Sequence, residues 1–172
     1  MTLSQSQREQ VLSLARSAAE AEVTGKALPS PPAPDGVLGE TRGCFVTLKN
    51  QGRLRGCIGT FRPRNPLGET IIEMGAAAAR DPRFVFQPIT PSELPAVDIE
   101  VSVLSPLDKT DRPEQLEVGT HGIFIVGKSS GCFLPEVATE MGWSAEEFLD
   151  HCCASKAGMP ARAWQDPDTT VY

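Results

Sequence analysis

Histidine is scarce in this chain of 172 residues, and its cysteines show no metal-binding spacing. Only His121 and His151 occur, and the five cysteines include no Cys-x-x-Cys pair. Structural zinc sites draw on closely spaced cysteine and histidine ligands, so spacing predicts no metal site here. An odd number of cysteines without a framework also argues against a secreted, disulfide-stapled protein. A metal held by ligands far apart in the sequence stays open.

The chain also lacks long apolar runs and an excess of basic residues. No stretch approaches the roughly 18 apolar residues of a membrane span, and residues 1–22 lack the apolar centre of a secretory signal. Lys and Arg number 16 against 22 Asp and Glu, which gives a net charge of −6. General nucleic-acid binders instead need a basic surface that neutralises phosphates. We therefore expect a cytoplasmic protein that binds neither nucleic acid nor membrane.

What the chain does contain fits one globular domain over residues 1–172, with 40% hydrophobic and 22% charged residues. Helical and alternating patterns follow one another in the order helix, hairpin, helix, strand, hairpin, helix. Strands joined by short turns pair antiparallel. The sequence therefore predicts an α+β fold with a mainly antiparallel sheet and flanking helices.

Capping residues and apolar spacing define the predicted elements. The expected helices span residues 4–24, 67–79 and 144–157, and the expected strands span residues 44–49, 53–61, 97–104, 122–126 and 131–134. Four prolines fall between Pro29 and Pro34, so residues 27–41 are predicted to form an extended surface loop. In the last helix, Trp143 is expected to pack on Phe148, and Cys152 to pack in the core.

The segment from Gly122 to Ser129 matches the letter pattern of a phosphate-binding loop. Such a loop needs a flexible turn after a strand and a helix that begins at its Lys-Ser end. Here the intervening residues are strand-like, and the segment leads into another strand. The sequence therefore predicts a hairpin and no nucleotide site.

The run Leu-Arg-Gly-Cys-Ile-Gly-Thr at residues 54–60 is the strongest candidate for chemistry. On a regular strand, Arg55 and Cys57 share one face, while Leu54 and Ile58 take the other. Gly56 and Gly59 would then leave the flanks of the sulfur uncovered. A nearby cation favours the thiolate, which is the nucleophilic form. The alternative is a small buried hydrophobe on a strand whose glycines mark a bulge, and both interpretations stay open.

Other polar residues are weaker candidates. His121 precedes a predicted strand and is either a general base that activates the thiol or a hydrogen-bonded residue that fixes its loop. Glu100 is either a polar partner of the site or a solvated carboxylate. Four arginines either line an anion site or solvate loops: Arg42, Arg62, Arg64 and Arg83.

Six segments in order resemble the AMMECR domain family (AMME chromosomal-region candidate family). They are Phe-Val-Thr-Leu at 45–48, Leu-Arg-Gly-Cys-Ile-Gly-Thr at 54–60, Asp-Pro-Arg-Phe at 81–84, Glu-Val-Ser-Val-Leu at 100–104, Gly-Thr-His-Gly at 119–122 and Phe-Leu-Pro-Glu-Val-Ala at 133–138. The resemblance extends from the first helix to Trp164, and the cysteine run is its most specific part.

The resemblance implies a larger and a smaller lobe, with the 54–60 motif at or near a cleft between them. It also implies a further extended segment after Tyr172. No reaction comes with the resemblance, but similar domains occur fused to or alongside Memo-like and radical S-adenosylmethionine proteins, which implies a shared modification pathway and possible partners.

Two functions follow as hypotheses. The first is a cysteine-dependent enzyme of unknown reaction and cofactor, with Cys57 as nucleophile or covalent anchor. In it, Arg55 stabilises the thiolate or an anionic substrate, and His121 serves as acid or base. The residues expected to contact substrate are Gly56, Gly59, Thr60 and Glu100. The second hypothesis is a non-catalytic binding or adaptor module in which Cys57 is only packed.

Overall fold

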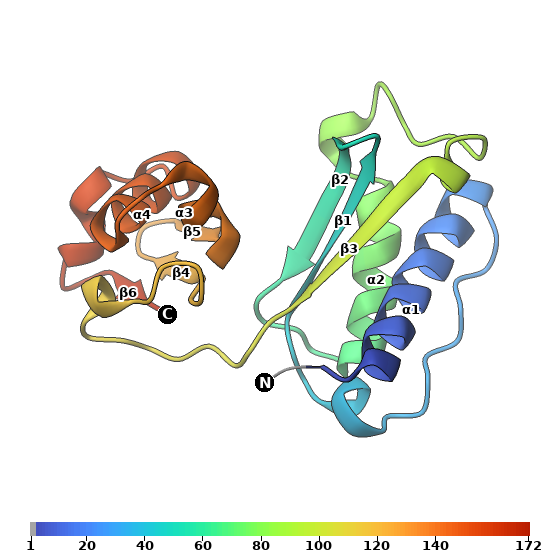
Figure 1. Cartoon of the computed structure of the whole chain (residues 1–172), viewed down its shortest axis with the longest axis horizontal. Helices are drawn as coiled ribbons and strands as arrows, with labels where there is room; N and C mark the ends of the chain where they lie inside the picture. Colours follow the sequence, from blue (N-terminus) through green and yellow to red (C-terminus); the bar gives the residue numbers. More distant parts are fainter. Residues whose placement is uncertain (1–2) are drawn as a thin grey trace. The chain divides into compact units, whose positions relative to one another are not determined.

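The computed structural model describes residues 3–172, which form two compact units, Met1–Pro106 and Leu107–Tyr172 (Figure 1). Each unit combines helices with a three-stranded antiparallel sheet. The predicted α+β class with antiparallel pairing and flanking helices is confirmed, although the strands are divided between two sheets. Within the described residues, no helix is both long and apolar enough to cross a membrane.

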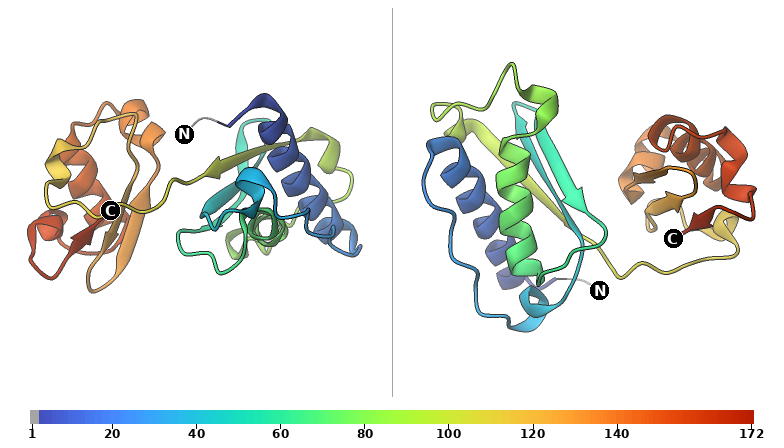
Figure 2. Two further views of the ribbon diagram at one scale, coloured as in Figure 1. Left: turned by 90° about the horizontal axis from the view of Figure 1, so that it is seen from below. Right: turned by 180° about the vertical axis from the view of Figure 1, so that it is seen from behind.

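The first unit places two helices on one face of its sheet, as the three views show (Figures 1 and 2). The strand order is β2-β1-β3, so β2 is an edge strand. Its helices and strands are α1 (Gln5–Thr24), β1 (Cys44–Asn50), β2 (Arg53–Thr60), α2 (Leu67–Ala79) and β3 (Val97–Val103). Short 3₁₀ helices are η1 (Gly36–Gly39), η2 (Pro82–Phe84) and η3 (Leu94–Ala96).

Capping explains the helix ends. The Ser4 hydroxyl accepts a hydrogen bond from the backbone N–H of Gln7, whose side chain accepts from the N–H of Ser4, as the capping pattern predicted. The helix stops where Gly25 adopts a left-handed conformation (φ 67°). At α2, Pro66 occupies the cap position and makes no side-chain hydrogen bond to the helix. Residues 27–41 are extended apart from η1, which buries Val37.

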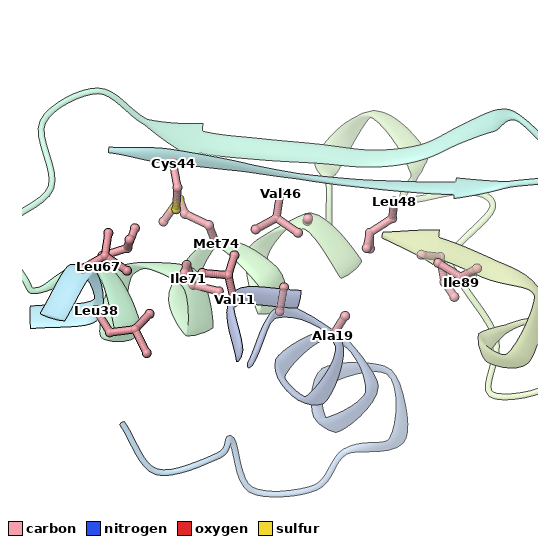
Figure 3. Packing of buried hydrophobic residues seen from close by; sticks show 14 residues of the cluster. Val11, Ala19, Leu38, Cys44, Val46, Leu48, Leu67, Ile71, Met74 and Ile89 are labelled. Carbon is pink, nitrogen blue, oxygen red and sulfur yellow. The ribbon is translucent and has the colours of Figure 1, made fainter. Parts of the chain in front are cut away.

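The core of the first unit lies between the sheet and its helices. Alternate side chains of β1 point to this core and are fully buried, namely Cys44, Val46 and Leu48. Figure 3 shows them facing Ile71 and Met74 of α2. The two helices pack closely because Gly75 of α2 leaves room for the backbone of α1. The side chains of β1 therefore alternate between a buried core face and a more exposed outer face.

A β-bulge interrupts β2 at Arg55. Leu48 of β1 pairs with Gly56, but its neighbour Lys49 pairs with Leu54, so Arg55 is the extra residue. Leu54 consequently lies on the side of the sheet opposite to Ile58, which pairs with the buried Val46. The prediction that Leu54 and Ile58 share a face is wrong, because the bulge shifts the alternation by one residue.

The two glycines of the motif permit close packing. A side chain at Gly56 would overlap the carbonyl oxygen of Ala78 at the end of α2. A side chain at Gly59 would overlap the ring of Phe45, which lies over this glycine. The expectation that both glycines leave the flanks of the sulfur uncovered is therefore wrong for Gly59, because an aromatic ring covers it.

The second unit has the strand order β5-β4-β6 with four short helical segments and a π-helical turn. Its elements are η4 (Pro113–Gln115), β4 (Ile123–Val126), β5 (Ser130–Phe133), α3 (Pro135–Met141), α4 (Ala145–His151), the π-helical turn η5 (Cys152–Lys156), η6 (Ala161–Gln165) and β6 (Thr170–Val171). The pairing of β4 with β5 confirms the hairpin that was predicted for this segment. The sequence analysis missed α3, although Pro135 and Gly142 are its start and stop signals.

Aromatic contacts organise the second core. The rings of Phe133 and Phe148 stack with centroids 5.5 Å apart. The rings of Trp143 and His151 stack with centroids 4.1 Å apart, and Trp143 also packs against the buried cluster that contains Phe148. Cys152 is fully buried, as expected for a core residue.

Substitution of Gly56 by alanine should destabilise the first unit more than substitution of Gly59. Backbone of α2 blocks the first position most closely, whereas the second meets the ring of Phe45 and, less closely, the backbone carbonyl of Cys44. We expect a loss of about 3 kcal/mol for Gly56→Ala and about 2 kcal/mol for Gly59→Ala. Amide hydrogen exchange of β1 measures both losses of stability. Intrinsic fluorescence would not report on the first unit, because the two tryptophans and the single tyrosine lie in the second unit. Equal losses would contradict the packing explanation.

Candidate functional site

Cys57 lies on β2 opposite Thr47 of β1. It is half-buried, unlike the fully buried thiol of Cys44 on the core side, whose pKa burial raises to about 12. The Thr47 hydroxyl donates a hydrogen bond to Sγ of Cys57 at 3.2 Å. Cys57 therefore has a hydrogen-bond donor directed at its sulfur.

Asp81 connects this strand to the loop that follows α2. The carboxylate is 3% exposed, and its Oδ2 accepts a hydrogen bond from the backbone N–H of Cys57 at 2.9 Å. Its Oδ1 accepts from the backbone N–H of Arg83 at 3.0 Å. One buried side chain thus fixes the backbone on both sides of the candidate site.

Arg83 is the cation that contacts Cys57. Its Nε donates to Oδ1 of Asp81 at 3.0 Å, and its Nη2 donates to the backbone carbonyl of Cys57 at 3.0 Å. Hydrogen bonding to Asp81 is the largest cause that raises the pKa of Arg83, and the Cys57 thiol adds to it. The guanidinium is therefore held in its charged form next to the backbone of Cys57.

The carboxyl group of Asp81 has an unusually low pKa in this setting. The Arg83 side-chain hydrogen bonds lower its pKa from 3.8 to about 2, with help from the backbone N–H groups of Cys57 and Arg83 and against the effect of burial. The site consequently holds a negative charge inside and a positive charge at the surface at neutral pH.

Arg55 has a different set of partners. Its guanidinium binds both carboxylate oxygens of Glu93 at 3.2 Å and the carbonyl of Pro88 at 3.3 Å. Backbone donation from Thr90, followed by the Arg55 hydrogen bond, lowers the pKa of Glu93. Arg55 thus fastens the loop before β3 to the edge strand, and the sequence analysis assigned its expected contact with the thiol to the wrong arginine.

The remaining predicted residues lie in separate settings. Thr60 accepts a hydrogen bond from the backbone N–H of Arg62 through its hydroxyl. Glu100 is exposed and pairs with Lys49 at 2.9 Å, as a solvated carboxylate would. His121 belongs to the second unit, where its Nδ1 accepts from the backbone N–H of Glu117 at 3.0 Å. This hydrogen bond fixes the loop that carries His121, and the role of His121 as acid or base stays a prediction.

The structure brings together Cys57, Thr47, Asp81 and Arg83. Neither Thr47 nor Asp81 was a predicted site residue, whereas Arg83 was a candidate either for an anion site or for a solvated loop. Asp81 and Arg83 also lie in the Asp-Pro-Arg-Phe segment that carries part of the family resemblance. Their meeting with β2 depends on how α2 crosses the sheet. Residues 3–172 contain no cluster of three or more His, Cys, Asp or Glu side chains arranged to hold a metal ion.

Replacing Asp81 with asparagine should loosen β2 at Cys57. A carboxyl pKa that is lowered on folding stabilises the protein above pH 4, and this contribution disappears as the pH falls towards 2. We expect a loss of about 2 kcal/mol at pH 7, which is roughly a thirtyfold faster exchange of the Cys57 amide. Asp98→Asn, an exposed carboxylate on β3, is the matched control. Equal exchange in the two variants, or a difference that persists at pH 2, would contradict this role.

Comparisons with known proteins agree with the motif resemblance. A protein of Methanothermobacter thermautotrophicus is 42% identical over 179 residues, covering 99% of this chain and 92% of the relative. A protein of Methanopyrus kandleri is 45% identical over 160 residues, covering 87% and 75%. The crystal structure of an uncharacterized Pyrococcus horikoshii protein matches with a TM-score of 0.82 and 39% identity, over 96% of this chain and 86% of that chain. The AMMECR1 family profile matches residues 12–172, and the chain belongs to the AMMECR1 family.

Proposed function

We propose that the protein is a cysteine-dependent enzyme in which Cys57 attacks the substrate or anchors it covalently. The observation that carries the proposal is the convergence of a hydroxyl and a guanidinium on one half-buried cysteine. Thiolates gain nucleophilic population where cations and hydrogen-bond donors surround the sulfur. In this proposal Arg83 takes the stabilising part expected of Arg55.

Rigid support for the charged groups strengthens the proposal. Asp81 is 3% exposed and bonded to both Cys57 and Arg83, so the cation is positioned before any substrate arrives. Preorganised charges act most strongly because no reorganisation is needed during the reaction. The side chain of Arg83 is 57% exposed, which leaves the site reachable from solvent.

Partner proteins and a cellular compartment are also part of the proposal. The fused or neighbouring Memo-like and radical S-adenosylmethionine proteins implied by the family resemblance are the candidate partners of a shared modification pathway. The cytoplasm is the candidate compartment, because a catalytic thiol requires surroundings that keep it reduced. The family membership of the chain supports the partners by association and supplies no reaction.

A binding or adaptor module is the second candidate function, and one observation favours it. Directly after Arg83 and Phe84, the chain exposes Val85 to 65% and Phe86 to 94%. Adjacent exposed apolar side chains are typical of surfaces that contact another molecule. An adaptor would use these residues and would not need the thiol.

Alkylation kinetics test the enzyme proposal. At pH 7, iodoacetamide should modify Cys57 faster than Cys132, a half-buried thiol of the second unit, when each site is followed by peptide mass spectrometry. Arg83→Gln should slow the reaction of Cys57 about threefold, the size of one partly exposed charge interaction, because the neighbouring cation is lost. Arg55→Gln is the matched control and should change the rate less than twofold. An accessible Cys57 that reacts no faster than Cys132 would contradict the proposal.

Paired substitutions separate the two functions. Cys57→Ser should abolish activity in cells while leaving the fold intact, as checked by amide exchange of β1. Phe86→Ser should leave cellular activity unchanged if the protein is an enzyme of the proposed kind. The opposite pattern, a silent Cys57→Ser with a damaging Phe86→Ser, would favour the adaptor.

A further inference from the structure

We propose that the substrate of the Cys57 site carries an anionic group, such as a carboxylate, that binds the outward edge of Arg83. This inference rests on the proposed function and adds the chemical class of its substrate.

Only one edge of the planar guanidinium of Arg83 is engaged by the protein. A guanidinium has five N–H donors in a fixed plane. Asp81 and the carbonyl of Cys57 engage Nε and Nη2. Within the described residues, Nη1 has no hydrogen-bond partner, so its two donors are available to a ligand. A planar edge of this kind binds carboxylate and phosphate oxygens in a defined orientation.

The two charges of the pair are not equally accessible. The side chain of Asp81 is 1% exposed and that of Arg83 is 57% exposed. An anion that approaches from solvent therefore meets the guanidinium first, while the carboxylate that neutralises it lies behind. The pair thus presents a positive end to the solvent even though its total charge is zero.

The positive end of the pair lies close to Cys57, so an anion bound there would be near the thiol. Nη2 of Arg83 lies 3.0 Å from the carbonyl oxygen of Cys57, and the guanidinium also interacts with the thiol. An anion bound to Arg83 would hold the neighbouring atoms of the same molecule beside the sulfur. Such positioning raises the rate of attack on a substrate that carries both groups.

Two small reagents with the same leaving group test the proposal on the full-length protein. Iodoacetate and iodoacetamide both react with a thiolate, forming a carbon–sulfur bond while iodide departs with the bonding electron pair. Only iodoacetate carries a carboxylate. The ratio of their rate constants at Cys57 is independent of the thiolate fraction, because both reagents use the same thiolate.

We expect the iodoacetate to iodoacetamide ratio at Cys57 to fall at least about threefold in Arg83→Gln, the size of one partly exposed charge pair. Arg80→Gln is the matched control, because Arg80 is 67% exposed, lies three residues away and pairs with Glu22. The ratio at Cys57 should be unchanged in that variant. Added salt should lower the wild-type ratio.

The outcomes separate this inference from the proposed function. A Cys57 that reacts rapidly with iodoacetamide but shows the same ratio in wild type and Arg83→Gln overturns the anionic substrate and leaves the enzyme proposal standing. A Cys57 that is accessible and slow with both reagents overturns both. If Arg83→Gln does not fold, Arg83→Lys and the salt dependence of the wild-type ratio test the inference instead. A wild-type ratio that does not change with salt overturns the inference.

Discussion

The buried carboxylate of Asp81 is the constraint on which the candidate site depends. β2 is an edge strand, and the N–H of Cys57 would otherwise lack a partner at that edge. Asp81 accepts this N–H, while Arg83, which Asp81 holds, donates to the carbonyl of the same residue. One charged pair therefore replaces a neighbouring strand at Cys57. The same pair supplies the charge beside the sulfur, so structural support and chemistry share their residues.

The glycines of the motif serve the same arrangement. Gly56 lets the end of α2 approach β2 closely, and this approach brings Asp81 within hydrogen-bonding distance of Cys57. Gly59 accommodates the ring of Phe45 on the side of the sheet that carries Cys57. The two glycines thus shape the surroundings of the thiol through packing on opposite sides of one strand.

Local patterns predicted much of the fold. The capping box at Ser4, the turn between β1 and β2, and the alternation of β3 depend on neighbours a few residues apart, and all are present. The predictions were wrong where one extra residue changed the pairing register of two strands. The bulge at Arg55 comes from the fit of β2 against β1 and has no letter pattern of its own. The short helix α3 was overlooked although its proline and glycine signals were present.

The sequence by itself determined the family, the antiparallel α+β class, and Cys57 as the centre of interest, because these follow from short motifs and local periodicity. Only the tertiary structure decided which cation contacts Cys57. Arg55 is two residues away in the chain, yet its charge is engaged by Glu93. Arg83 is 26 residues away and is brought to the backbone carbonyl of Cys57 by the path of α2 and by Asp81. Distance along the chain fixes neither hydrogen-bond partners nor charge pairs, because these depend on how helices cross a sheet.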